Sequence, residues 1–367
     1  MNTTNPIPAT QNDAWGFYGT MNEQADAAWP LAMTAISDAT CQPLESVRTF
    51  LDSRHGRHFA DDVQNGLYAG DALADAINAA TGWLLVGLLQ LAVMLVVIAP
   101  LERWRPVEPL RDHAAVRTDV IYTLIHRLGL VRVVLFFTTA VLWDGLFGAL
   151  RTHGWQTWQL DALWPGVTDQ PLLSLLLYLL VFDLLDYWIH RGQHHFDWWW
   201  SLHSLHHSQR QMTQWSDSRN HLLDDLLRDA IIVSVAQCIG VAPGQFVAIV
   251  ALTQLSENLH HANLRLWFGH WGERLWISPR FHRRHHAIGI GHEPMAPVRN
   301  KKVHGNNFGV LLPWWDILFG TANFDLRYDP TGIRDQVQAN AKGQLRDYGR
   351  GFWAQQWLAV LRLMGRA

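Results

Sequence analysis

Apolar positions gather in four stretches of an otherwise polar chain. The clearest stretch, residues 82–100, contains no charged residue and approaches the roughly 20 apolar residues that a membrane-spanning helix requires. Residues 121–147 form a second candidate span, although basic side chains interrupt its first half. Residues 171–187 form a third, in which Asp183 and Asp186 indicate that its end is enclosed by protein rather than lipid. The pattern predicts an all-α, multi-pass bundle of membrane helices.

The chain divides into three parts around these stretches. Residues 1–80 hold ten Asp and Glu against three Arg and no Lys, which predicts an acidic extension whose role the sequence does not reveal. Residues 81–330 are predicted to form the membrane-embedded catalytic domain. Residues 331–367 form a polar tail that ends in Trp353, Trp357 and further apolar residues spaced among arginines. This end predicts an amphipathic helix, which either lies on the membrane surface or packs on the catalytic domain.

Composition agrees with a membrane protein. Charged residues make up 17% of the chain, where about a quarter is usual for soluble domains. The chain has 20 Trp, a residue that favours membrane–water interfaces. A net charge of −3 gives no indication of a nucleic-acid partner. The two cysteines, Cys41 and Cys238, are too far apart in the sequence to indicate a disulfide framework or a CxxC metal site.

Fifteen of the 20 histidines fall between residues 190 and 304, and most keep helical spacing. Neutral imidazole is the commonest protein ligand of transition metals, and residues three or four apart share a helix face. Three such boxes supply eight nitrogens, which is too many for one metal ion and suits two. The sequence therefore predicts a dinuclear metal site with ligands from the boxes His190 and His194; His203, His206 and His207; and His282, His285 and His286.

Single histidines and nearby acids extend this site. Asp183 and Asp186 lie on the same predicted helix face as His190, where a carboxylate can hold the far nitrogen of a ligating imidazole. His221 alone is ambiguous between a ligand, an outer residue and a surface residue. One of the adjacent His260 and His261 is expected to face the site, and His261 is preferred. Residues 306–309 and 313–321 are typical of a turn and of an aromatic, membrane-facing edge.

Residues 230–254 are apolar but are interrupted around Gly240 and Pro243. Each half has about eleven residues, which is too short to cross a bilayer alone. One kinked span and a hairpin that dips in and returns are the two alternatives. Histidine boxes precede and follow this segment, and a shared metal site requires the chain to return to the same side, which favours the hairpin.

The distribution of basic residues predicts an orientation. The loop of residues 102–118 carries four arginines and the loop of residues 148–170 only one, while the histidine-rich region is also rich in Arg and Lys. Because cytoplasmic loops carry an excess of Lys and Arg, the metal site is predicted to face the cytoplasm, with the acidic extension outside.

The histidine motifs resemble those of the fatty acid hydroxylase superfamily, which includes sterol desaturases, sterol C4-methyl oxidases and alkylglycerol monooxygenases. The matching patterns are H-R-x-x-H at residues 190–194, H-x-x-H-H at 203–207 and P-R-x-H-R-x-H-H at 279–286. The pairs His261 and Asn263, and His221 and Asp224, together with W-D-x-x-F-G-T at 315–321, also match. Leu222 stands where the family has a proline, which affects only the expected loop shape. The resemblance covers about residues 85–325.

The resemblance implies a non-haem enzyme with two Fe ions that uses O2 to hydroxylate or desaturate a lipid or sterol-like substrate. Electrons come from a separate ferredoxin- or cytochrome-type donor, since no haem, flavin or nicotinamide motif is present. The implied metal ligands are His190, His194, His203, His206, His207, His221, His261, His282, His285 and His286. The implied residues behind these ligands are Asp183, Asp186, Asp224 and Asn263.

Two other classes compete with this hypothesis. A histidine-rich metal transporter requires polar residues along several spans, whereas these histidines lie at span ends. A zinc hydrolase usually mixes histidine with a carboxylate ligand and a general-base Glu, and no HExxH motif occurs. Oxidation of an unactivated C–H bond requires a redox-active metal, which zinc is not.

Overall fold

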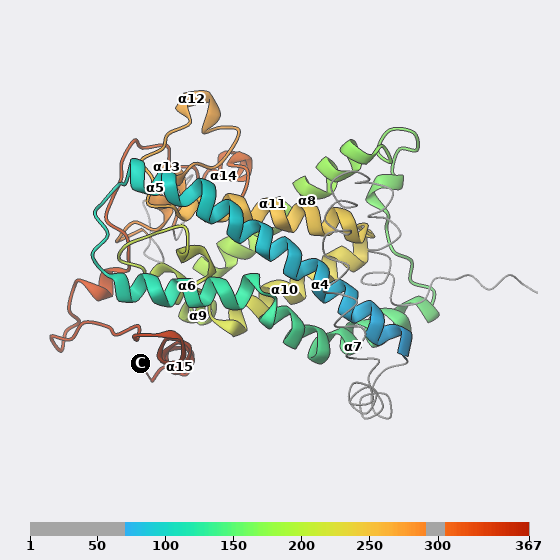
Figure 1. Cartoon of the computed structure of the whole chain (residues 1–367), viewed down its shortest axis with the longest axis horizontal. Helices are drawn as coiled ribbons and strands as arrows, with labels where there is room; N and C mark the ends of the chain where they lie inside the picture. Colours follow the sequence, from blue (N-terminus) through green and yellow to red (C-terminus); the bar gives the residue numbers. More distant parts are fainter. Residues whose placement is uncertain (1–69, 291–304, 367) are drawn as a thin grey trace, which may run out of the picture.

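The computed structural model describes residues 70–290 and 305–366. Within these ranges the chain forms helices and loops and no strand, and Ala287 and Thr331 form an isolated β-bridge. The predicted all-helical fold is therefore confirmed for this part of the chain. Several of the longer helices run roughly along the long axis of the molecule, whereas the C-terminal helix is seen nearly end-on (Figure 1). They are α4 (Gly70–Val93), α5 (Ala99–Trp104), α6 (His113–Arg127), α7 (Leu130–Thr152), α8 (Pro171–His195), α9 (Asp197–His207), α10 (Leu222–Ile239), α11 (Pro243–His261), α12 (Gly269–Gly272), α13 (Pro279–His285), α14 (Trp314–Phe319) and α15 (Phe352–Leu363).

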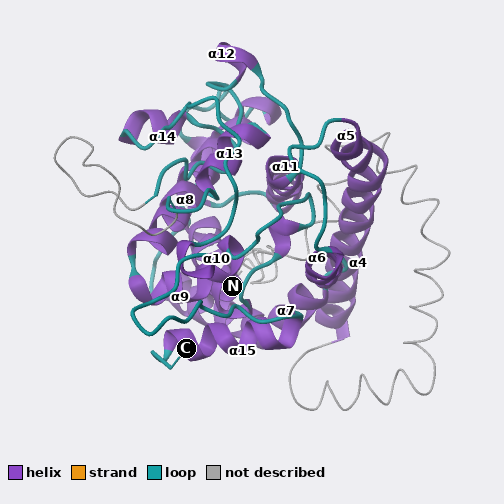
Figure 2. Cartoon of the chain, turned by 90° about the vertical axis from the view of Figure 1, so that its left-hand side faces the viewer, coloured by secondary structure: helices purple, strands orange, loops and turns teal. Residues whose placement is uncertain are grey.

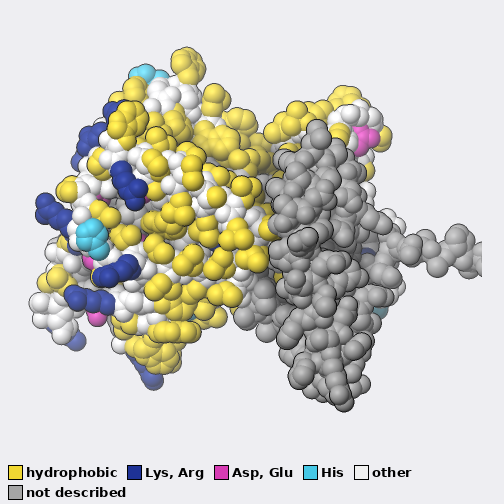
Figure 3. All heavy atoms as spheres, viewed as in Figure 1, with side chains coloured by type: hydrophobic (Ala, Val, Ile, Leu, Met, Phe, Trp, Pro, Cys, Tyr) yellow, Lys and Arg dark blue, Asp and Glu magenta, His cyan; other side chains and the backbone are white. Residues whose placement is uncertain are grey.

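Two helical stretches among the described residues are long and apolar enough to cross a membrane, Ala80–Trp104 and Pro171–His195. The first joins α4 to α5 through a π-helical turn at Met94–Ile98. Helix α4 begins at Gly70, so it runs through the boundary predicted at residue 80, and residues 1–69 of the acidic extension lie outside the described residues. Hydrophobic side chains cover the middle of the visible surface, while Lys and Arg gather at one end (Figure 3).

The single span predicted for residues 121–147 is wrong, because the chain breaks there into α6 and α7. Gly129 adopts a left-handed conformation with φ of 76° between the two helices. The side chain of Arg127, at the end of α6, is only 3% exposed and pairs with Asp217 at 3.2 Å, so it belongs to the protein interior. Helix α4 crosses α6 closely at Gly87, where a Cβ atom would lie 1.7 Å from the carbonyl oxygen of Arg127.

The chain turns back on itself within residues 230–254, as the prediction of a shared metal site required. Helix α10 ends at a left-handed Gly240 with φ of 69°, and α11 begins at Pro243. The Tyr178 hydroxyl of α8 lies 3.1 Å from the carbonyl oxygen of Ile239 and so ties the turn to α8. At the other ends of the helices, Arg228 of α10 lies 3.7 Å from Glu257 of α11.

The C-terminal helix α15 packs along α9 (Figure 2). Gln356, Ala359 and Arg362 of α15 are buried, and Arg362 Nε donates to the carbonyl oxygen of Ser201 on α9 at 3.3 Å. Trp353 and Trp357 remain 78% and 61% exposed. Of the two alternatives for the tail, the structure shows the helix that packs on the catalytic domain.

Candidate metal centre

Eight buried imidazoles form two groups of four. Within each group, one ring nitrogen from every residue lies within 4.8 Å of the others. We call them the first group, made of His190, His194, His207 and His285, and the second group, made of His206, His261, His282 and His286. The groups adjoin each other, because the ring centroids of His207 and His286 are 4.2 Å apart.

Helix geometry explains how three histidine boxes and His261 serve two groups. Successive helical residues point about 100° apart, so neighbours in the sequence face different directions. His206 and His207 at the end of α9 therefore belong to different groups, as do His285 and His286 at the end of α13. Helix α8 supplies only the first group and α11 only the second.

The distances between nitrogens suit a metal ion. The Nε2 atoms of His206 and His261 are 3.1 Å apart, as are those of His207 and His285. Metal–nitrogen bonds of about 2.1 Å place ligands roughly 3.0 to 3.4 Å apart in octahedral or tetrahedral geometry. The buried Nε2 atom of His190 has no hydrogen-bond partner. Each group therefore fits one transition-metal ion.

The protonation state of the imidazoles also suits metal binding. Burial, followed by the neighbouring imidazoles, lowers the pKa of His206, His207, His282 and His286 well below the usual range. Burial lowers the pKa of His285 to about 3. These rings are neutral at pH 7, which leaves a lone pair for a metal ion.

Backbone carbonyls orient the first group. His190 Nδ1 donates to the carbonyl oxygen of Phe308 at 2.9 Å, and His285 Nδ1 donates to that of Asn306 at 2.6 Å. The buried Asp316 holds this loop, because its carboxylate accepts hydrogen bonds from the backbone N–H groups of Phe308 and Gly309 at 2.9 and 2.7 Å. Residues predicted to form a turn and a membrane-facing edge thus support two imidazoles. Of these supporting residues, the sequence marked only 315–321, through their resemblance to the family motif.

A carboxylate and a carbonyl group stand behind the second group. His261 Nδ1 donates to the carbonyl oxygen of Glu257 at 2.8 Å and lies 3.6 Å from Asp217 Oδ1. Asp217 lies in the short 3-10 helix Ser216–Ser218, which packs against α6 and α11. Neither its spacing nor a motif marked it, and the sequence prediction missed it.

Of the four residues predicted behind the ligands, Asp224 is the one whose described contacts include an imidazole. It accepts hydrogen bonds from His203 Nδ1 at 3.1 Å, Gln193 Nε2 at 2.8 Å and Trp199 Nε1 at 2.6 Å. The other three hold surrounding segments through polar contacts, Asp183 with the backbone N–H of Leu311, Asp186 with Arg228 and Asn263 with the backbone N–H of Val107.

Two predicted ligands lie outside both groups. His203 stands beside them, with ring centroids 5.1 Å from both His194 and His207, and its buried Nε2 atom has no hydrogen-bond partner. His221 instead caps α10. Its Nδ1 accepts a hydrogen bond from the backbone N–H of Leu223 at 3.1 Å, and its Nε2 donates to the carbonyl oxygen of Gln356 at 3.0 Å. Both ring nitrogens of His221 are therefore engaged away from the metal groups.

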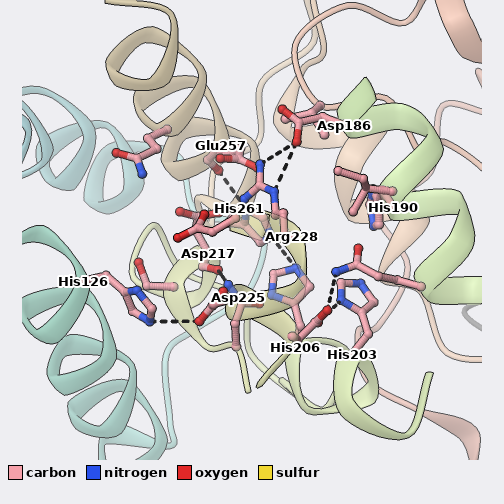
Figure 4. A pocket seen from close by; sticks show the side chains of 18 of the residues that line it. His126, Asp186, His190, His203, His206, Asp217, Asp225, Arg228, Glu257 and His261 are labelled. Atoms are coloured by element: carbon pink, nitrogen blue, oxygen red, sulfur yellow. Dashed lines mark hydrogen bonds and ion pairs between the residues drawn. The ribbon is translucent and has the colours of Figure 1, made fainter. Parts of the chain in front are cut away.

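A polar pocket of about 120 Å³ adjoins the second group (Figure 4). Its lining includes His206, His261 and His282 together with acidic and basic side chains from α6, α8, α10 and α11. His260 also lines it, and the buried His260 lies 2.7 Å through Nε2 from Ser256 Oγ, outside both groups. The preference for His261 over His260 agrees with this arrangement.

Comparison with known proteins agrees with the residues that build this centre. Residues 175–321 match the family model described as fatty acid hydroxylase. An ornithine lipid hydroxylase, OlsE, from Rhizobium tropici is 29% identical over 49% of this chain and 50% of its own length. A Delta(7)-sterol 5(6)-desaturase, erg3C, from Aspergillus fumigatus is 26% identical over 44% of this chain and 50% of its own. An alkylglycerol monooxygenase from Caenorhabditis elegans is 25% identical over 48% of this chain and 31% of its own length.

The chain thus spans half or less of the length of these relatives. No solved structure matches it. The matched region contains most of α8 and all of α9 to α14, and with them every histidine of the two groups. The match of residues 175–321 to the fatty acid hydroxylase model confirms the resemblance that the histidine motifs predicted.

Proposed function

We propose that this chain is a membrane-bound oxidoreductase, a non-haem di-iron oxygenase that hydroxylates or desaturates a lipid or sterol-like substrate with O2 and two electrons. The observation that supports the proposal best is the pair of adjoining four-imidazole groups in a domain of the fatty acid hydroxylase family. The relatives bear the names of a hydroxylase, a desaturase and a monooxygenase of lipids, so oxidation is their shared activity.

The donor set favours iron among the candidate metals. All-nitrogen ligation suits iron, copper, nickel and zinc, and the oxidative chemistry of the relatives excludes a metal without redox activity. When bound, an iron pair supplies the oxidising power for an unactivated C–H bond. Of the predicted ligands, we propose the eight residues of the two groups, with His203 beside them. His221 is left out, because both of its ring nitrogens are engaged elsewhere.

The residues of this chain hold that centre in place. Carbonyl oxygens of residues 306 and 308 fix two imidazole rings of the first group, and Asp224 fixes His203. All eight histidines are buried, so surrounding side chains restrict the movement of their rings. Ligands fixed in this way stay in one geometry while the substrate binds.

The setting supports a multi-pass membrane protein whose centre faces the cytoplasm. His190 and His194 lie near the C-terminal end of the candidate span Pro171–His195, which supports a centre at a membrane edge. Lys and Arg gather at one end of the molecule (Figure 3), as the excess of basic residues on the cytoplasmic side requires. A long apolar substrate then enters sideways from the bilayer, and a separate ferredoxin- or cytochrome-type protein supplies electrons. Hydroxylation is preferred over desaturation.

Isotope labelling tests this function. Membranes that contain the chain are supplied with a reduced electron donor and with heavy-oxygen gas, and the lipids are analysed by mass spectrometry. Heavy oxygen in a lipid product is the expected result. A new alkene without label indicates desaturation instead. Lipid that changes equally well without O2 contradicts the oxygenase proposal and favours a hydrolase.

A further inference from the structure

The pocket beside the second group is lined by more carboxyl groups than guanidinium groups (Figure 4). Two guanidinium groups line it, those of Arg127 and Arg228. Carboxylates outnumber them by four, since the acidic side chains of the lining are Asp186, Asp217, Asp224, Asp225, Asp229 and Glu257. An excess of buried charge is unfavourable unless an opposite charge lies nearby.

Both guanidinium groups pair with carboxylates of the lining. Arg228 is shared between Asp186 at 3.0 Å and Glu257 at 3.7 Å. Arg127 pairs with Asp217 at 3.2 Å. The lining holds three further acids, Asp224, Asp225 and Asp229.

Two more acids of the lining have described contacts with donors other than arginine. Asp225 Oδ2 lies 3.4 Å from His126 Nε2. The carboxylate of Asp224 accepts hydrogen bonds from His203, Gln193 and Trp199. Hydrogen bonds of this kind satisfy oxygen atoms without adding a guanidinium group to the lining.

The occupied metal centre would have an excess of positive charge. Neutral imidazoles add no charge, so two divalent ions in the two groups would bring four positive charges without an anionic ligand. His206, His261 and His282 of the second group line the pocket together with His190 of the first, so its carboxylates lie in the same pocket as these imidazoles. His206 and His282 belong to the same lining, and their buried Nδ1 atoms have no hydrogen-bond partner.

We propose that the carboxylates of this pocket, with Asp217 foremost, are the counter-charge that retains the two metal ions, although none of them is a ligand. The inference rests on the proposed di-metal function. Asp217 is the clearest case, because its Oδ1 lies 3.6 Å from His261 Nδ1 while its Oδ2 pairs with Arg127. These acids are positioning residues, and they act on the metals through charge across a low-dielectric interior.

Charge-changing and charge-conserving variants of the metal-loaded, full-length protein separate this role from a structural one. Asp217→Asn removes one negative charge and should weaken metal retention about 10- to 100-fold. Arg127→Gln alone removes a positive charge and should retain metal at least as well as the unmodified protein. The double variant restores the net charge and should return retention to within a few-fold. The readout is metal per chain by mass spectrometry after competition with chelators of graded affinity.

A structural role predicts the opposite order, with the double variant at least as impaired as Asp217→Asn. That order, or equal loss in Arg127→Gln and Asp217→Asn, overturns the proposal. Asp225→Asn is a second test in case Asp217→Asn does not fold, and it should also weaken retention. Asp335→Asn is the matched control, because Asp335 lies outside the pocket and pairs with Arg346 at 3.5 Å. Full metal retention in both Asp217→Asn and Asp225→Asn also overturns the proposal.

Metal binding by the unmodified protein distinguishes failure of the di-metal function from failure of the counter-charge role. If it binds no metal in iron-replete cells, the proposed di-metal function fails, and the counter-charge role fails with it. If it binds two ions and all variants retain them equally, the counter-charge role alone fails.

Discussion

The two histidine groups use the same residue type at the same burial, yet their surroundings differ. The first group is oriented by backbone carbonyls of the loop at residues 306–308, which Asp316 holds in place. The second group contacts a carbonyl of its own helix, and three of its imidazoles line the charged pocket, against His190 alone from the first group. Carbonyl groups fix direction with little net charge, whereas carboxylates add charge. We therefore expect geometry to matter more for the first group and electrostatics more for the second.

The largest effect should follow loss of a ligand from either group. His285→Ala removes a ligand from the first group and His282→Ala one from the second. Each variant should lose more than about 100-fold in activity and fall from two metal ions per chain towards one, since loss of an outer partner alone costs 10- to 100-fold. Product formation and metal content are the measurements. The control is His153→Ala, an exposed position remote from the groups in the sequence, and equal loss there contradicts the assignment.

A smaller effect, confined to the first group, should follow Asp316→Asn. The amide replaces one of the two oxygens that accept from Phe308 and Gly309, so the carbonyl that orients His190 shifts. We expect the affinity for one metal ion to fall about 10- to 100-fold while the other ion stays bound. Chelator competition followed by metal analysis measures the two ions. Equal weakening of both ions would show that the groups are not held independently.

The smallest effect should follow His221→Ala. The substitution removes the N-terminal cap of α10 and the hydrogen bond to Gln356, which should lower the free energy of unfolding by about 1 kcal/mol. Both metal ions should remain bound, and thermal unfolding with metal analysis reports the two quantities. A folded variant that loses a metal ion would restore the role that the sequence motif predicted for His221.

The sequence by itself determined the helical class, the spacing of the three histidine boxes and the family of residues 175–321. These properties follow from local periodicity, because residues three and four apart on a helix must share a face. The shared metal site that these boxes predicted favoured the return of the chain between α10 and α11. Apolar content was a poorer guide at residues 121–147, where it suggested one span but Gly129 and the inward-facing Arg127 divide the helix.

Only the tertiary structure decided how the histidines divide between the two groups and what stands behind them. Adjacent residues such as His206 and His207 go to different groups according to how α9 is rotated against α11 and α13, which spacing along one helix does not specify. The same applies to Asp217, which reaches His261 from 44 residues away in the sequence, and to His221, whose partner Gln356 lies on α15. Contacts between distant segments depend on packing, and no local pattern encodes them.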